Sequence, residues 1–248
     1  MFPSNRFQAG TTASSTFLVE AVGPRGVGKS TFVRFLRDRL QALGVEHDRL
    51  TPVRATQRAG FRLFRSVGSL YTRPLWTSWA PLTREDLLIH EKRFWHYRYQ
   101  TWRIDRSPGL HLLDEGIFQL ILTLTVRMPL QDPARVEKRL RRLVRFPDLV
   151  LFVHAPEEEI RARRKLRGNS RDQLRLKVSP AGTAATRAVR EALERLQPGR
   201  GEVLFVESSD LESLRRRAEE VADLIVERVG AVAAAAPTAA GTGGSTRP

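Results

Sequence analysis

The glycine-rich stretch at residues 19–32, VEAVGPRGVGKSTF, constrains the fold of this chain more than any other segment. Gly23, Gly28, Lys29 and Ser30 match the pattern G-x-x-x-x-G-K-[ST] without a gap. An apolar run precedes the pattern and an apolar repeat of helical period follows it, so the loop is expected to join a strand to a helix. Glycines let consecutive backbone N–H groups point into one concavity, and a helix N-terminus adds partial positive charge. The stretch therefore predicts a phosphate-binding loop.

Three side chains of this loop are expected to have separate roles. Lys29 should reach the β- and γ-phosphates of a nucleoside triphosphate, Ser30 should ligate Mg²⁺, and Thr31 should support the first helical turn. The predicted nucleotide-binding residues are Gly23, Pro24, Arg25, Gly26, Val27, Gly28, Lys29, Ser30 and Thr31.

Short apolar runs alternate with segments of helical period along the chain. Strands are predicted at 16–22, 45–50, 109–113, 148–154 and 202–206. Helices are predicted after the phosphate loop and at 84–107, 156–168 and 210–229, whereas 116–126 fits a helix or a strand. Strands separated by helix-length segments form parallel sheets with both faces covered, and ligands bind beyond the carboxyl ends of the strands. The expected fold class is therefore α/β, a three-layer P-loop NTPase fold with a five-stranded parallel sheet flanked by helices.

The sequence also predicts where the first helix ends and which face of the helix at 84–107 is apolar. Gly44 stands where the first helix should stop. In the helix at 84–107, Leu88, Trp95, Tyr99 and Trp102 are expected to share one face. The basic, aromatic segment before that helix, residues 51–81, is typical of a substrate lid, in which Trp76 and Trp79 line either an acceptor pocket or the edge of the core.

One folded domain is expected at residues 16–229, between two disordered tails. Residues 1–15 are rich in small polar residues and residues 230–248 are of low complexity. The chain of 248 residues has no cysteine, which excludes disulfides and thiolate metal sites. No signal peptide and no apolar run long enough to span a bilayer is found, so a cytoplasmic location without membrane contact is expected.

The chain is strongly basic, with a formal net charge of +15 and a sequence pI near 11.3. Such a charge ordinarily suggests a polyanionic partner. Most of the basic residues are arginines spread over many segments, a skew that codon bias also produces. Nucleic acid is therefore less favoured as a partner than a small molecule, and a homodimer stays open.

An acidic pair, Asp114 and Glu115, follows the predicted strand at 109–113. A P-loop NTPase holds its metal with an aspartate at such a strand end, so Asp114 and Ser30 are the predicted Mg²⁺ ligands. The alternative is an acidic pair favoured by a helix N-terminus. A guanine-specific GTPase is not expected, because neither Asn5 nor Asn169 is followed by lysine.

Four short patches resemble the thymidylate kinase branch of the P-loop nucleoside and nucleotide kinases. They are the phosphate loop, DLLIHEKRFWH at 86–96, LLDEG at 112–116 and RRKLRG at 163–168. The resemblance implies that Asp114 lies on the metal side of the site. It also implies an arginine-rich lid at about 161–180 that closes over the phosphates.

The arginines of that implied lid are Arg164 and Arg167, with Arg161 and Arg171 as further candidates. Spacing supports this assignment, because Arg164 and Arg167 lie three residues apart on one helix face. Planar guanidinium groups also suit the oxygens of a transferring phosphoryl group. The alternative is a solvated basic helix end.

The resemblance places the acceptor site on the helix that contains residues 86–96. Arg93 falls on the position of an arginine that holds the acceptor's phosphate, and His96 on that of a histidine often found nearby. Arg25 replaces an aspartate that meets the sugar hydroxyl, and it inverts the charge there. With Arg93, it suggests an anionic acceptor.

Two further departures from the family pattern lie on the acceptor side. Ile89 occupies the place of an aromatic ring that stacks on the pyrimidine. Glu115 and Gly116 stand where the family has an arginine and a ring. The resemblance therefore supports phosphoryl transfer more strongly than it supports thymidylate as the acceptor.

The leading hypothesis is ATP- and Mg²⁺-dependent phosphoryl transfer to a small acceptor, which is a nucleoside monophosphate, a nucleoside or a sugar derivative, with an anionic acceptor favoured. The catalytic residues would be Lys29, Asp114, Glu115, Arg164 and Arg167, with Asp114 or Glu115 orienting or deprotonating the acceptor hydroxyl. One alternative is a nucleotide-switched P-loop ATPase or binding protein that acts on nucleic acid or an acidic partner. Another is a degenerate kinase fold retained for binding.

Overall fold

The computed structural model describes residues 16–24, 26–48, 84–114, 116–127, 144–166 and 202–235. Several predictions therefore lie outside the described residues. These concern the tail at 1–15, the segment 51–81, Arg25, Glu115, the lid beyond residue 166 and the chain after residue 235.

A five-stranded parallel sheet forms the centre of the described structure, as the sequence predicts. Its strands are β1 (Thr16–Val22), β2 (His47–Asp48), β3 (Gly109–Leu113), β4 (Leu149–His154) and β5 (Glu202–Glu207). The strand order is β2-β3-β1-β4-β5 and every pairing is parallel. Because β1 lies between β3 and β4, the loop that follows β1 emerges between the carboxyl ends of both neighbours.

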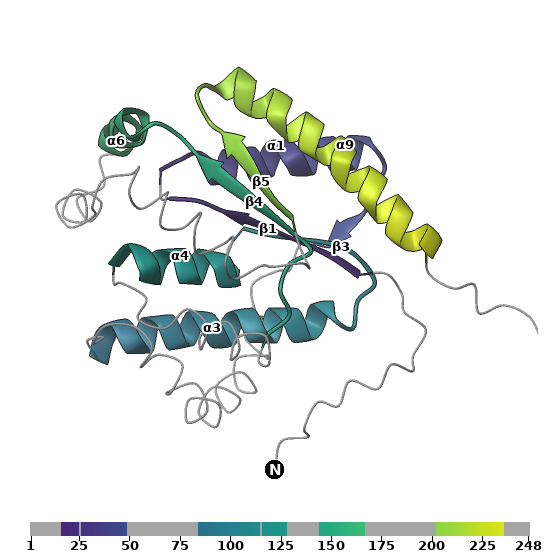
Figure 1. Cartoon of the computed structure of the whole chain (residues 1–248), viewed down its shortest axis with the longest axis horizontal. Coiled ribbons are helices and arrows are strands. Elements are labelled where there is room, and N and C mark those ends of the chain that lie inside the picture. The colour runs from purple at the N-terminus through teal and green to yellow at the C-terminus, as the bar shows by residue number, and fades with distance from the viewer. Residues whose placement is uncertain are drawn as a thin grey trace, which may run out of the picture.

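Helices cover both faces of this sheet (Figure 1). They are α1 (Lys29–Ala42), α3 (Arg84–Ile104), α4 (Ile117–Arg127), α6 (Glu157–Leu166) and α9 (Leu211–Ala235). Figure 1 shows α1 and α9 on one face and α3 and α4 on the other. The segment that fits either structure in the sequence is the helix α4. In addition, α9 continues to Ala235, so its last turns belong to the segment expected to be a tail.

The side chains of β1 alternate between two apolar clusters. Phe17, Val19 and Ala21 pack with α1 and α9, whereas Leu18 and Val22 pack with α3 and α4. All five side chains are buried, which is why the strand reads as a continuous apolar run.

A glycine with a left-handed conformation follows the C-terminus of α1. Leu43 is the C-cap, and its N–H donates to the carbonyl of Arg39. Gly44 follows with φ of 72°, a left-handed conformation that glycine adopts without steric cost. The predicted stop at Gly44 is confirmed.

The predicted face of α3 is wrong at one end of the helix. Trp95 is buried, but Trp102 is 47% exposed and stacks on the half-buried Tyr99. The face towards the sheet is formed instead by Phe94, Trp95, Tyr97 and Ile104. The guanidinium of Arg106 covers the exposed indole ring at 4.2 Å, which lets this large ring remain at the surface.

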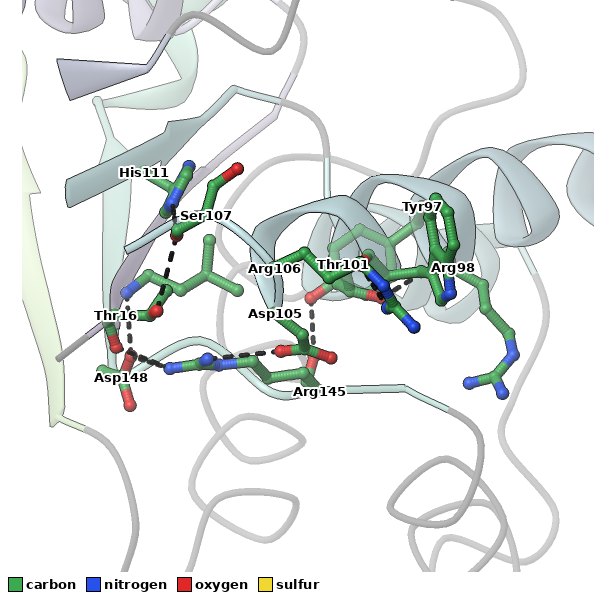
Figure 2. A network of polar contacts seen from close by, with 12 residues as sticks. Thr16, Tyr97, Arg98, Thr101, Asp105, Arg106, Ser107, His111, Arg145 and Asp148 are labelled. Carbon is green, nitrogen blue, oxygen red and sulfur yellow. Dashed lines mark hydrogen bonds and ion pairs between the residues drawn. The ribbon is translucent and has the colours of Figure 1, made fainter. Parts of the chain in front are cut away.

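A polar network closes the amino end of the sheet (Figure 2). Arg145 donates to the carbonyl of Thr16 at 2.7 Å, to Asp148 at 3.0 Å and to Asp105 at 3.3 Å. The carboxylate of Asp148 also accepts the N–H of Leu18 at 2.8 Å. The start of β1 is thus connected to the start of β4 and to the turn after α3.

Among the described residues, no helix has the length and apolar character needed to cross a membrane.

Candidate functional site

The glycines of the loop between β1 and α1 stand at positions where a side chain would be strained or would clash. Gly26 and Gly28 have φ of 90° and 99°, where a side chain would be strained. Gly23 is required for a different reason, because a Cβ atom there would lie 2.4 Å from the carbonyl oxygen of Val153. The fold therefore favours glycine over other residues at each of these three positions.

The N-terminus of α1 is open to an anion. Its N-cap is Gly28, no side chain of the described residues caps it, and no acidic residue lies in its first turn. The first amides of a helix have no partner within the helix, and the helix dipole makes this end partially positive. Lys29, Ser30 and Thr31 form this first turn, with Ser30 exposed. The chain's own residues thus fit a bound phosphate group.

Lys29 connects the loop to the neighbouring strand. Its Nζ donates a hydrogen bond to the backbone carbonyl of Asp114, the residue directly after β3. The side chain of Asp114 is exposed at this strand end. The structure therefore brings together the predicted lysine and the predicted metal-side aspartate.

The donor set near this strand end fits Mg²⁺ of the kind that retains several waters. Such an ion uses one or two protein oxygens together with phosphate oxygens. Ser30 and Asp114 supply one hydroxyl and one exposed carboxylate, and the described residues contain no cluster of three or more metal-binding side chains. Ser30 and Asp114 would hold the ion, which would neutralise phosphate charge.

The structure adds a buried carboxylate that the sequence analysis missed. Glu20 has no exposed surface, and its Oε1 accepts the N–H of Gln119 at 2.9 Å. Gln119 in turn accepts the N–H of Gly23 at 3.1 Å through its own Oε1. Glu20 is thus connected through α4 to the first glycine of the phosphate loop.

Burial raises the pKa of Glu20 to about 7. Hydrogen bonds from the backbone of Gln119, Phe118 and Gly116 and the charge of Lys29 oppose this shift, but desolvation is the largest cause. Gly116 leaves room for the carboxyl group, since a Cβ there would lie 2.3 Å from the Cδ of Glu20. A single acidic residue inside an apolar run was the signal in the sequence.

Arg163 is the second residue beside the phosphate loop that sequence reasoning missed. It lies on α6 and donates to the carbonyl of Val27 in the phosphate loop at 3.0 Å. It also contacts Ser208 and Ser209 after β5 and pairs with Glu159 at 2.7 Å. The acid four residues before an arginine on a helix was the available signal.

The other predicted site residues are only partly described. Arg93 is exposed and His96 is half-buried, and both lie on α3. Arg93 lies 11 residues before the end of α3 at Ile104, about 16 Å back along the helix. Arg161 is exposed on α6. The acceptor role of Arg93 and His96 stays a prediction.

The implied lid is not tested by the described residues. The backbone of Arg164 belongs to α6, but its side chain, Arg167 and Arg171 lie outside the described residues, as do Arg25 and Glu115. Their predicted roles therefore remain predictions.

No family model and no curated protein matches this chain. Among solved structures, it is similar to the thymidylate kinase of Ehrlichia chaffeensis, at 14% identity over 84% of this chain and 98% of that chain, with a TM-score of 0.48. It is also similar to the thymidylate kinase of Candida albicans, at 13% identity over 87% of this chain and 94% of that chain, with a TM-score of 0.47. Such weak similarity says nothing about the substrate. From its own glycine loop, the open N-terminus of α1 and the parallel sheet, the chain has an α/β P-loop fold.

Proposed function

We propose that this protein is a kinase that transfers a phosphoryl group from ATP, in the presence of Mg²⁺, to a small anionic acceptor. The observation that carries the proposal is the arrangement around Lys29. This lysine stands at the open N-terminus of α1 and reaches the backbone of Asp114 at the end of the adjacent strand. A triphosphate on the loop would therefore lie between a cation, a set of helix amides and a carboxylate.

The chain's own residues would perform the steps that such a transfer requires. The amides of the loop bind the phosphates, and Lys29 neutralises charge that develops between donor and acceptor. Asp114 or Glu115 orients the acceptor hydroxyl or takes its proton, and the implied lid arginines, Arg164 and Arg167, cover the phosphates. Arg25, Arg93 and His96 are the proposed acceptor contacts, and they favour a nucleoside monophosphate or a phosphorylated sugar.

The test is ADP release from ATP and Mg²⁺ with a panel of nucleoside monophosphates, nucleosides and phosphorylated sugars, followed by mass detection of the product. Lys29→Ala should lower turnover by at least a hundredfold, because an oxyanion-stabilising contact contributes about 3–4 kcal/mol to the transition state. Arg216→Ala, which removes an exposed cation from α9, is the control and should keep full activity. If Lys29→Ala retains full turnover with an acceptor that the wild type uses, the proposal is wrong.

A second candidate function is a nucleotide-switched binding protein for nucleic acid. The chain carries a net charge of +15, which attracts a polyanion such as single-stranded nucleic acid. ATP hydrolysis stimulated by single-stranded DNA or RNA, with no product from any acceptor in the panel, would favour this function.

A further inference from the structure

The guanidinium of Arg163 connects three separate segments, one of which is the phosphate loop. One terminal nitrogen donates to the carbonyl of Val27 and to the hydroxyl of Ser208, both at 3.0 Å. The other donates to the carbonyls of Ser208 at 3.0 Å and Ser209 at 2.9 Å and to the carboxylate of Glu159 at 2.7 Å. The phosphate loop, α6 and the turn between β5 and α9 are thus connected through one side chain.

These contacts occupy both terminal nitrogens of Arg163 with protein oxygens. A guanidinium presents its N–H donors in a fixed planar fork, so donors that point at carbonyls do not also point at a phosphate. Arg163 therefore differs from the arginines implied for the lid, which would contact the ligand directly. Arg163 must therefore act through the residues that it holds.

The peptide between Val27 and Gly28 is one of the groups that it holds. In a planar trans peptide, the C=O and the N–H point in opposite directions. Because the carbonyl of Val27 points at Arg163, the N–H of Gly28 points away from Arg163. Gly28 has no Cβ and a φ of 99°, so its own conformation restricts this peptide weakly. The hydrogen bond from Arg163 supplies a restraint on this peptide that the glycine does not.

The turn after β5 packs directly against the same position. A Cβ on Gly28 would lie 2.9 Å from the hydroxyl of Ser208 and 3.5 Å from Arg163. Ser208 is 1% exposed, and its N–H donates to the carbonyl of His154 at the end of β4. The loop therefore rests on a buried and hydrogen-bonded surface where it enters α1.

We propose that Arg163 is a positioning residue, which holds the Val27–Gly28 peptide in the orientation that binds a polyphosphate and connects that orientation to the turn at Ser208 and Ser209. This inference rests on the proposed function, since it assumes that the loop binds the phosphates of ATP. It assigns to α6 a role in forming the phosphate site in addition to any contact that its arginines make with the ligand.

The test is calorimetric titration of the full chain with two probes, Mg²⁺–ATP and inorganic tripolyphosphate. Arg163→Met keeps much of the apolar stem and removes every donor, and it should weaken the binding of both probes by at least tenfold. Arg163→Lys keeps the charge but cannot form the fork, so it should bind with intermediate affinity. Glu159→Gln keeps the contacts of Arg163 with the loop and should weaken binding less than threefold. Arg216→Met is the matched control on α9 and should bind as the wild type does.

Two further measurements separate positioning from simple loss of structure. Hydrogen exchange of residues 23–31 without ligand should be faster in Arg163→Met than in the wild type, while exchange of α9 should stay unchanged. Should Arg163→Met fail to fold, Arg163→Lys and Ser208→Ala decide instead, and both should weaken tripolyphosphate binding. Wild-type affinity for both probes in the folded Arg163 variants, together with loss of binding in Lys29→Ala, would overturn this inference and leave the proposed function intact. If the wild type binds neither probe, the proposed function fails and this inference fails with it.

Discussion

Glu20 lies in the middle of a strand whose neighbouring side chains are apolar, and none of its surface reaches solvent. Its Oε1 is hydrogen-bonded, but its Oε2 has no hydrogen-bond partner among the described residues. A buried carboxylate with one unsatisfied oxygen is costly in its charged form. The carboxyl group nevertheless accepts the N–H of Gln119 in the first turn of α4, and the side chain of Gln119 accepts the N–H of Gly23, so the helix is held beside the phosphate loop.

The first prediction follows from the pKa of Glu20, which burial raises to about 7. The folded state binds its proton more tightly than the unfolded state, so stability from this group is present at low pH and is lost as pH rises through about 4.5 to 7. A shift of this size corresponds to about 3 kcal/mol. Glu20→Gln cannot ionise. Between pH 5 and pH 8, the free energy of unfolding of the wild type should therefore fall relative to that of Glu20→Gln by up to about 3 kcal/mol. Urea denaturation at a series of pH values measures this difference. Parallel pH profiles for the two proteins would contradict this explanation.

The second prediction concerns two glycines with opposite surroundings. Gly116→Ala would place a methyl group against the buried carboxyl group of Glu20, so it should lower the free energy of unfolding by about 2 kcal/mol or more. Gly230→Ala is the matched control, because Gly230 lies in α9 and nothing surrounds a Cβ there within 4 Å. It should raise stability by about 0.5–1 kcal/mol. Thermal denaturation compares both variants, and equal effects would show that the contact with Glu20 is unimportant.

At the scale of whole elements, the sequence predicts what is periodic or continuous. The strands β1 and β3 begin and end where their apolar runs do, because both faces of the central sheet are covered. In α4, the only polar residues before Arg127 are Gln119, Thr123 and Thr125, which are too few for their period to distinguish a helix from a strand. The face of α3 was mispredicted because Trp102 is large and apolar, whereas Arg106 and Tyr99 stabilise it at the surface.

The candidate site shows the same division between local and distant information. The geometry around Gly23, Gly28 and Lys29 follows from one contiguous motif, so the sequence predicted it. The contacts of Glu20 with Gln119 and of Arg163 with Val27 join residues that are far apart in the chain. No local pattern encodes such pairs. The structure was needed to find them.

The third prediction concerns the network at the amino end of the sheet. Arg145→Met removes the contacts that join Thr16, Asp105 and Asp148 (Figure 2). The side chains of Arg145 and Asp148 are 27% and 35% exposed, so solvent screens part of their interaction. We expect a loss of about 1–2 kcal/mol in the free energy of unfolding.

The control for this network is Arg217→Met, which removes an ion pair with Glu220 whose side chains are 54% and 49% exposed. Such surface pairs contribute about 0–1 kcal/mol, so this variant should unfold nearly as the wild type does. Both variants should keep wild-type affinity for Mg²⁺–ATP, since the network lies at the end of the sheet opposite the phosphate loop. A loss of nucleotide affinity in Arg145→Met would show that the two ends of the sheet are coupled.

At the scale of the whole molecule, the two ends of the sheet have different chemistry. The amino end is closed by ion pairs between Arg145 and two aspartates. The carboxyl end presents Lys29 and the open N-terminus of α1. In addition to this local difference, the whole chain carries a net charge of +15, which attracts any polyanion regardless of site. Binding at the loop and attraction by the whole surface must therefore be separated by their response to salt and to single substitutions.

The last prediction makes that separation. Mg²⁺–ATP at about a hundred times its dissociation constant should stabilise the folded protein by about 2.7 kcal/mol, which raises the melting temperature by roughly 5–10 °C. Lys29→Ala should lose most of this shift and Arg216→Ala should keep it, because one of these cations lies at the loop and the other on α9. Single-stranded DNA, by contrast, should bind through many arginines, so its affinity should fall steeply between 50 and 200 mM salt and should be nearly the same in the two variants. A shift by ATP that is equal in both variants, or that falls with salt as steeply as DNA binding does, would mean that the whole surface and not the loop binds the nucleotide.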